Sequence, residues 1–379
     1  MKILLLVRSL GIGGTERQTV ELAKGLHARG HSVTVATFYP RGEFTEGLRF
    51  SGVPVRSLDK KGRYDIVPFM LRLLSLVREV KPEVLYTMMP AENLAGLAAK
   101  LCFPSLRLVW GVRSSFLDFT HYDLFTRLVY RVEALLSRFP DLVIANSRAG
   151  ADSRISKGFP REKVRVVWNG IDCNRFAPDH SAGEQMRRRW GVRDDRLVIG
   201  MVGRLDPMKD HFTFLRAAKT LALTRDIFEF VCVGGGGQPS HADQLSALDG
   251  ELQEQGKLHW IPFEDNMPAV YNGLNLLVLC SAFGEGFPNV IGEAMACGIP
   301  CVVTDVGDSA TLVGDAGWII PSRDPEALAA AVERALQEMQ QRDVGADARE
   351  RALAEFGLGR FLAETERVLS PLVGNHESH

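Results

Sequence analysis

The chain has 379 residues, of which 46% are hydrophobic and 24% charged, which is typical of a soluble globular enzyme. That length is too great for one hydrophobic core and predicts two domains. The net charge of −1 hides an asymmetry, because residues 1–180 carry 27 Lys and Arg against 17 Asp and Glu, a net +10, and the remainder carries 18 against 29, a net −11. The two halves therefore meet different partners, unless the asymmetry is a chance scatter of surface charge.

Membrane-spanning, secreted and zinc-binding classes are not expected. The opening M-K-I-L-L-L-V is too short for a signal peptide or a membrane span, and no other run approaches eighteen apolar residues. The six cysteines are scattered and form no C-x-x-C pair, which disfavours zinc and disulfide frameworks. A reducing compartment fits this cysteine usage, so we expect a cytoplasmic protein.

The first half alternates between apolar strands and amphipathic helices. Strands are predicted near 2–7, 32–37, 84–87, 106–111 and 141–145, and helices near 15–29, 65–80 and 123–138. Such alternation predicts a parallel sheet with helices on both faces.

Turn residues become dense at 169–182, where we place a linker between a first domain, 1–178, and a second, 179–356. The alternation then restarts with strands near 198–203, 228–234, 276–279 and 301–304 and helices that include 209–224, 290–297 and 324–340. The sequence therefore predicts an α/β fold of two Rossmann-like domains that face a central cleft, with ligands at the carboxyl ends of the strands.

Glycine loops supply the first candidate binding sites. Gly11, Gly13 and Gly14 precede a helix, where backbone N–H groups can approach an anion. Glu16 occupies the sixth position of a would-be G-x-G-x-x-G motif, which argues against NAD, and no G-K-[ST] of a Walker loop follows. The alternative is a tight strand-to-helix turn capped by Thr15.

Two further loops follow strands of the second half. In V-G-R-L-D-P-M-K-D, at 202–210, Arg204 and Lys209 lie five residues apart and suit a diphosphate, unless both are merely solvated. The run V-G-G-G-G-Q, at 233–238, permits close backbone approach to a ligand or forms a flexible turn.

The stretch E-G-F-P-N-V-I-G-E-A, residues 285–294, places two carboxylates around a helix start. Glu293 is the only charged residue among the nineteen between Glu285 and Asp305, and an unpaired buried carboxylate is costly. Pro288 suits a first helical turn, so the free N–H groups near Phe287–Val290, those of Phe287, Asn289 and Val290 beside Pro288, form a partly positive site. An anion site flanked by hydroxyl-binding carboxylates suits a nucleotide sugar.

These motifs carry a family resemblance. E-G-F-P-N-V-I-G-E-A-M-A-C-G-I-P resembles the E-x7-E signature of family 4 retaining glycosyltransferases with the GT-B fold, and V-G-R-L-D-P-M-K-D resembles their G-R-L-x-x-x-K segment. V-I-A-N-S at 143–147 and V-V-W-N-G-I-D at 166–172 are similar to further segments of the family, so the resemblance covers residues 1 to about 369.

The resemblance implies roles for individual residues. Glu293 would hold the ribose hydroxyls, Glu285 would contact the donor sugar, and Arg204 and Lys209 would neutralise the leaving diphosphate. The other expected donor contacts are Gly13, Gly14, Ile261, Phe263, Phe287, Pro288, Asn289 and Val290. Residues 357–379 would cross back onto the first domain.

The acceptor side departs from the family pattern. Where many members place a histidine, this chain has Arg113, and His121 is either a substitute or a loop surface residue. Arg113 would pair with an acceptor phosphate or with structural carboxylates.

The expected reaction is transfer of a sugar from a nucleotide sugar, a UDP-sugar first of all, to an acceptor hydroxyl in glycan, polysaccharide or glycolipid assembly. No metal or other cofactor and no nucleic-acid partner is expected. We favour front-face attack, with Glu285 as covalent nucleophile the alternative. A GT-B sugar-nucleotide epimerase and a non-catalytic GT-B subunit are the rival functions.

The positive half also suggests an anionic acceptor. Lys60, Lys61 and Arg63 form a basic turn before the apolar segment 66–77. A basic turn beside an apolar helix can lie on an anionic membrane. This suits a lipid-linked acceptor and peripheral membrane contact. The alternative is a core helix with a solvated loop.

Overall fold

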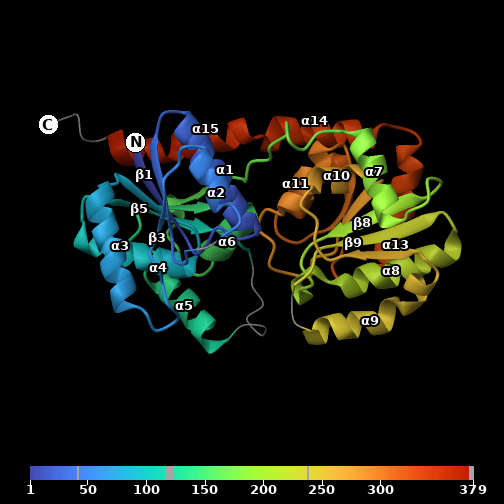
Figure 1. Cartoon of the computed structure of the whole chain (residues 1–379), viewed down its shortest axis with the longest axis horizontal. Coiled ribbons are helices and arrows are strands. Elements are labelled where there is room, and N and C mark those ends of the chain that lie inside the picture. Colours follow the sequence, from blue (N-terminus) through green and yellow to red (C-terminus); the bar gives the residue numbers. More distant parts are fainter. Residues whose placement is uncertain (41, 116–122, 237–238, 375–379) are drawn as a thin grey trace. The chain divides into compact units, whose positions relative to one another are not determined.

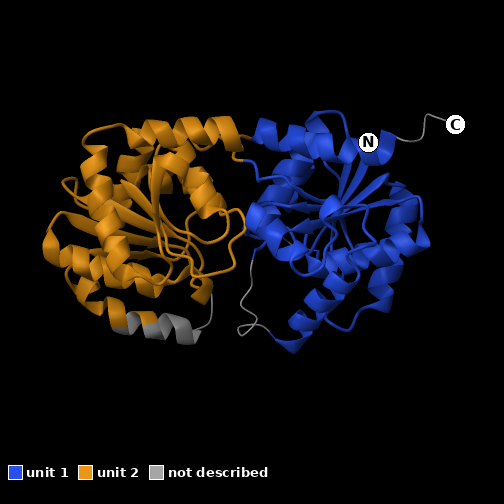
Figure 2. Cartoon of the chain, turned by 180° about the vertical axis from the view of Figure 1, so that it is seen from behind, with its two compact units in different colours: residues 1–170, 358–379 blue, residues 171–357 orange. Residues whose placement is uncertain are grey.

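The computed structural model describes residues 1–40, 42–115, 123–236 and 239–374, and the chain forms two compact units (Figures 1 and 2). Unit 1 comprises Met1–Gly170 with Leu358–His379, and unit 2 comprises Ile171–Gly357. The predicted domains were 1–178 with 357–379, and 179–356. Residues after Ile171 belong to unit 2 because Ile171 pairs with Gly357 and Phe176 packs edge-on against Tyr271, with ring centroids 5.9 Å apart.

Unit 1 is a seven-stranded parallel sheet in the order β3-β2-β1-β4-β5-β6-β7, with helices between the strands. Its elements are β1 (Lys2–Val7), α1 (Gly14–Ala28), β2 (Ser32–Thr37), α2 (Thr45–Phe50), β3 (Val55–Ser57), α3 (Val67–Val80), β4 (Val84–Thr87), α4 (Pro90–Cys102), β5 (Arg107–Val112), α5 (Leu124–Leu135), β6 (Leu142–Ala145), α6 (Arg148–Ile155), β7 (Val164–Val166) and α15 (Leu358–Val373).

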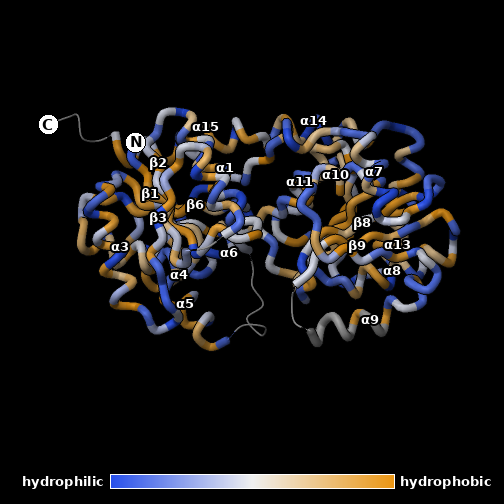
Figure 3. Tube along the Cα trace, viewed as in Figure 1, coloured by the Kyte–Doolittle hydropathy of each residue, from blue (hydrophilic) through white to orange (hydrophobic). Residues whose placement is uncertain are grey.

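Both faces of this sheet are buried at its centre, which explains why strands such as β1 and β6 are almost entirely apolar. Ile3 and Leu5 point into one core with α1 and α15, whereas Leu4 and Leu6 point into a second core with α3 and α4. Figure 3 shows these strands as a hydrophobic centre. The C-terminal helix α15 lies beside α1, as predicted, and completes the first core with Phe361, Leu362, Val368 and Leu369 (Figure 1).

Unit 2 repeats the architecture with six parallel strands in the order β10-β9-β8-β11-β12-β13. Its elements are α7 (His180–Trp190), β8 (Leu197–Val202), the 3₁₀ helix η3 (Pro207–Lys209), α8 (His211–Thr224), β9 (Phe228–Val233), α9 (Pro239–Glu254), β10 (Leu258–Ile261), α10 (Met267–Asn272), β11 (Leu276–Leu279), α11 (Asn289–Ala296), β12 (Cys301–Thr304), α12 (Ser309–Val313), β13 (Gly317–Ile320), α13 (Pro325–Met339) and α14 (Val344–Phe356).

The two sheets confirm the predicted α/β fold of two Rossmann-like domains. In both units the first strand pairs with the second on one side and with a later strand on the other, so the strand order reverses beside it. Ligands of such sheets bind at the carboxyl ends of the strands near that reversal. Within the described ranges, no helix combines the length and apolar character that crossing a bilayer requires.

Candidate donor and acceptor sites

The loop after β8 carries Arg204 and leads to Lys209, the loop after β9 begins the glycine run at Gly234, and the loop after β11 carries Glu285. These three strands are neighbours in the sheet of unit 2, so the loops at their carboxyl ends adjoin. Lys209 and Glu285 meet there, with Lys209 Nζ 2.6 Å from Glu285 Oε1. Ser281 Oγ donates a second hydrogen bond to the same oxygen, at 2.5 Å. The site therefore holds a buried, hydrogen-bonded ion pair at the strand ends.

Backbone contacts hold this pair in place. Thr304 Oγ1 donates to the carbonyl oxygen of Ser281 at 2.7 Å, which ties the end of β11 to the end of β12. Gly307 has φ +65°, and a Cβ there would lie 2.5 Å from the carbonyl oxygen of Glu285. Only glycine fits this approach, so the loop after β12 supports the loop that carries Glu285. Neither Ser281 nor Gly307 was predicted as a site residue, because no local motif singles out either one.

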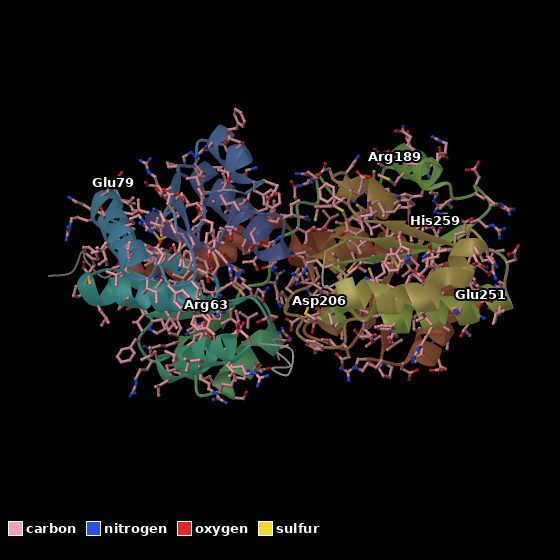
Figure 4. The ribbon with its side chains drawn as sticks, turned by 60° about the horizontal axis from the view of Figure 1, so that its bottom comes forward. Arg63, Glu79, Arg189, Asp206, Glu251 and His259 are labelled. Carbon is pink, nitrogen blue, oxygen red and sulfur yellow. The ribbon has the colours of Figure 1, made fainter. Side chains whose placement is uncertain are left out.

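Arg204 does not join the Lys209–Glu285 pair. Its side chain is 72% exposed, and its guanidinium lies 3.7 Å from Asp206, which is labelled in Figure 4. Although the two residues lie only five apart, on either side of Pro207, Lys209 is held in the site and Arg204 lies at the surface.

Glu293 lies in the second turn of α11, as predicted, and is only 2% exposed. Tyr271 of α10 donates its hydroxyl hydrogen to Glu293 Oε2 at 2.7 Å. That contact stabilises the carboxylate that stands alone in the local sequence. Tyr271 is 22 residues away along the chain, and no local pattern connects it with Glu293.

The residues around the start of α11 are buried or half-buried. Pro288 stands just before the helix, Phe287 is buried against Phe356, and Asn289 and Val290 are half-buried. Ile261, at the end of β10, accepts a hydrogen bond from the Gly234 N–H at 2.8 Å, and Phe263 is exposed. The predicted donor residues of unit 2 thus line one edge of its sheet.

A cavity of about 190 Å³ opens beside the glycine run after β9, lined by Leu205, Gly234, Gly235, Leu245, Asp249, Gln253, Trp260 and Pro262. Gly234 has φ +129°, and a Cβ there would lie 2.1 Å from the carbonyl oxygen of Gly203. At Gly234 the glycine run therefore packs closely against the backbone of Gly203. The described part of the run, which ends at Gly236, is not simply a flexible turn.

In unit 1 the glycine loop caps α1. Gly13 stands just before the helix in extended backbone, and Gly14 is its first residue. A Cβ on Gly13 would lie 2.2 Å from Glu16 Oε2, so the Glu16 carboxylate folds over this turn. A phosphate that approaches Gly13 has to displace that carboxylate.

Arg113, at the end of β5, is held by uncharged groups. Its guanidinium donates to Asn169 Oδ1 at 3.2 Å and to the Tyr86 hydroxyl at 3.1 Å. Burial raises the pKa of Tyr86, and the Arg113 charge opposes that shift. His121 lies outside the described residues.

Glu92, which the sequence analysis did not single out, lies in the first turn of α4 near this edge. It is 1% exposed, and burial raises its pKa to about 7, with the charge of Arg8 opposing the shift and those of Glu16 and Glu133 adding to it. Among the described residues no hydrogen bond reaches its Oε1. No three His, Cys, Asp or Glu side chains in the described ranges cluster as metal ligands.

Two family models match the chain. Residues 12–175 match Glycosyltransferase Family 4, and residues 183–351 match Glycosyl transferases group 1. Together the models cover most of both units.

Curated relatives support the same assignment. The chain is 30% identical to a D-inositol 3-phosphate glycosyltransferase of Salinispora tropica, over 63% of this chain and 52% of that protein. It is 28% identical to a GDP-mannose-dependent alpha-mannosyltransferase of Mycobacterium tuberculosis, over 80% and 78% of the two chains. The chain spans about half the length of the first relatives that it matches.

Solved structures share the fold. Anabaena Alr3699/HepE in complex with UDP-glucose has a TM-score of 0.86 at 24% identity, over 98% of this chain and all of that one. The lipopolysaccharide glycosyltransferase WaaG has a TM-score of 0.74 at 16% identity, over 97% and 99%. With two Rossmann-like sheets and these matches in both halves, the chain belongs to the family 4 (group 1) glycosyltransferases of the GT-B fold.

Proposed function

We propose that this chain is a retaining, metal-independent glycosyltransferase that moves a sugar from a UDP-sugar to an acceptor hydroxyl in glycan, polysaccharide or glycolipid assembly. The observation that carries the proposal is the buried Lys209–Glu285 pair at the carboxyl edge of unit 2, with the Tyr271–Glu293 pair on α11. The UDP and UDP-glucose complexes of the Anabaena neighbour support a uridine nucleotide as donor.

In this proposal the donor diphosphate competes for Lys209. The ammonium group and the start of α11 stabilise the negative charge that develops on the leaving diphosphate, and Arg204 swings in from the surface. Glu285 contacts the transferred sugar, and Glu293 binds the ribose hydroxyls. The two cationic side chains then supply the charge stabilisation that a metal ion gives elsewhere.

The proposed chemistry is front-face attack. The acceptor hydroxyl oxygen forms a bond to the anomeric carbon on the face that the diphosphate leaves, and the carbon–oxygen bond to phosphate breaks. The hydroxyl proton passes to the departing phosphate oxygen. The configuration at the anomeric carbon is thereby kept. Ser281 donates a hydrogen bond to Glu285 Oε1, which lowers the nucleophilicity of that oxygen and disfavours a covalent role for it, even when Lys209 has turned to the diphosphate.

The acceptor side is proposed to be unit 1, with Arg113 near an anionic group of the acceptor. A relative from Escherichia coli, 30% identical over 45% of each chain, is named for an acceptor linked to diphosphoundecaprenol. We propose a lipid-linked acceptor and a cytoplasmic protein in peripheral contact with the membrane. Lys60 turns inward, toward the Gly62 carbonyl and over the Phe69 ring, so the exposed cations of the basic turn are Lys61 and Arg63.

The test is a screen of nucleotide sugars by thermal shift, followed by product analysis with EDTA present. Arg204→Ala and Lys209→Ala should each lower kcat by about 10²–10³, the usual effect of losing one electrostatic stabiliser of a leaving charge. Arg193→Ala, which removes an exposed arginine paired with Asp195, is the matched control and should leave kcat unchanged. Strict dependence on added divalent ions, or turnover of donor without acceptor into an epimer, would contradict the proposal.

A further inference from the structure

Unit 1 exposes an unusual cluster of large apolar side chains at the starts of α3 and α5. Tyr64 is 91% exposed, Val67 69% and Leu124 81%. We call the cluster the α3–α5 patch, and its members are Tyr64, Ile66, Val67, Leu71, Leu124, Phe125 and Leu128. Single exposed apolar residues are normal on soluble proteins, but an adjoining set of this size marks an interaction surface.

The two halves of the patch adjoin because Arg63 joins them. Arg63 Nη2 lies 2.8 Å from Asp123 Oδ2, and the guanidinium lies 4.4 Å from the centre of the Phe125 ring. Arg63 is labelled in Figure 4, and Figure 1 shows α3 and α5 on the same unit. Asp123 also caps α5 through the Thr126 N–H, so the contact fixes the first turn of that helix.

The exposed face of α5 is apolar with cations in it. At 100° per residue Leu124, Leu128, Arg131 and Leu135 share one face of the helix, and all four are exposed. Glu133, on the opposite face, is fully buried. In α3, Val67 and Leu71 likewise face outward while Phe69 and Leu73 are buried. Both helices therefore have the pattern of interfacial helices, with an apolar face beside basic residues.

Charge identifies the partner. Two carboxylates beside the patch are engaged among the described residues, since Asp65 pairs with Arg72 at 2.7 Å and Asp123 pairs with Arg63. Lys61 and Arg131 are exposed beside the patch, and unit 1 as a whole carries 28 Lys and Arg against 18 Asp and Glu, a net +10. This charge opposes face-to-face contact between two copies of unit 1, whereas anionic lipid headgroups complement it.

We propose that the α3–α5 patch docks unit 1 on an anionic bilayer, with the apolar side chains inserted among the headgroups and the cations against lipid phosphates. The inference deepens the proposed membrane contact and rests on the proposed function for its purpose. Helices of a parallel α/β unit begin at the carboxyl edge of the sheet, so the patch flanks the edge that carries Arg113. A lipid-linked acceptor on that bilayer would be presented to this edge.

The experiment is sedimentation of the full chain with phosphatidylcholine vesicles that do or do not contain phosphatidylglycerol, at low and high salt. The unchanged chain should bind only the anionic vesicles, and salt should weaken the binding. Leu124→Ser with Leu128→Ser should lower the partition coefficient tenfold or more, and Arg131→Ala should lower it two- to fivefold. Leu101→Ser with Leu223→Ser, which removes two other exposed leucines, is the matched control and should bind as the unchanged chain does.

Nucleotide-sugar binding and the melting temperature are measured on the same samples. No binding of the unchanged chain to anionic vesicles, or equal binding by the Leu124/Leu128 variant, would overturn the inference. Light scattering that shows a dimer, broken by the Leu124/Leu128 variant, would overturn it in favour of self-association. Vesicle binding without any nucleotide-sugar binding would instead contradict the proposed function and leave the docking surface standing.

Discussion

Glu293 accepts a hydrogen bond from Tyr271, a partner that no local sequence pattern predicts. The carboxylate is 2% exposed and accepts the Tyr271 hydroxyl hydrogen at 2.7 Å. A carboxylate accepts several hydrogen bonds, so the contact with Tyr271 is compatible with the proposed ribose-binding role of Glu293. The tyrosine therefore fixes the orientation of the carboxylate before a ligand arrives, which is a positioning role.

This pair predicts a specific change in sugar recognition. Glu293→Gln should weaken UDP binding by about 1–3 kcal/mol, because a charged acceptor is lost. Tyr271→Phe should reduce the preference for UDP over 2′,3′-dideoxy-UDP. Without the tyrosine hydroxyl, the Glu293 carboxylate is less well oriented and binds the ribose hydroxyls less tightly. Calorimetry with both ligands measures that ratio, which a general loss of stability does not move. An unchanged ratio in Tyr271→Phe would remove the positioning role.

Glu92 of unit 1 is a buried carboxyl group whose protonation affects stability. Its folded pKa of about 7 exceeds its ordinary value of 4.5, so the folded chain holds a proton that the unfolded chain releases between these pH values. The contribution of Glu92 to the free energy of unfolding is therefore favourable at low pH and is lost as the pH rises through 7.

Glu92→Gln should remove this dependence because glutamine stays neutral. At pH 8 the variant should be about 1–3 kcal/mol more stable than the unchanged chain, and at about pH 4, below both pKa values, the two should match. Urea unfolding at both pH values measures the difference. A stability gap that is equal at the two pH values would show that Glu92 is not the group that titrates.

At the scale of elements, the backbone at Gly170, the last residue of the first segment of unit 1, contacts both α1 and α15. Gln18 of α1 donates to the Gly170 carbonyl at 2.8 Å and accepts from the Gly170 N–H at 3.0 Å. A Cβ on Gly170 would lie 2.8 Å from Leu358 Cδ2 and 2.9 Å from Phe361 Cβ. The glycine thus lets α15 pack directly on the backbone.

Gly170→Ala should push α15 away and destabilise unit 1 by about 1–3 kcal/mol, the usual cost of overpacking. The control is Gly359→Ala, in α15 itself, because a Cβ at Gly359 would meet nothing within 4 Å. That control should stabilise the helix by about 0.5–1 kcal/mol. Thermal unfolding of both variants gives the comparison, and equal effects would contradict the packing argument.

Elements were predictable where their signal is local. Continuous apolar runs such as Lys2–Val7 predict buried parallel strands, and the structure places β1 over the same residues. The start of α11 follows from Pro288, within one residue. Pairings between distant residues were not predictable, because nothing near Glu293 points to Tyr271. The exposure of Arg204 was missed for the same reason, since spacing along a loop does not determine where its side chains point.

At the scale of the molecule, charge divides between the units. Unit 1 carries a net +10 and unit 2 carries 17 Lys and Arg against 28 Asp and Glu, a net −11. The composition alone predicted this division, whereas the boundary required contacts such as that between Ile171 and Gly357.

The asymmetry predicts a salt effect on the acceptor. Raising the ionic strength from about 50 to about 300 mM should increase the acceptor KM several-fold, because attraction between unit 1 and an anionic acceptor is screened. An uncharged acceptor analogue is the control, and its KM should change little. Steady-state assays with both acceptors decide the matter, and equal salt effects would exclude electrostatic recruitment.

Unit 1 is assembled from both ends of the chain, and this has a consequence for its synthesis. Domains tend to fold in order as they leave the ribosome. Unit 1 is the first to be synthesised but the last to be completed. Its core lacks Phe361, Leu362, Val368 and Leu369 until α15 emerges from the ribosome. Unit 2, continuous from Ile171 to Gly357, is available whole before then. Nascent chains that stop short of α15 should therefore display an unfilled hydrophobic surface and be targets for chaperones and proteases.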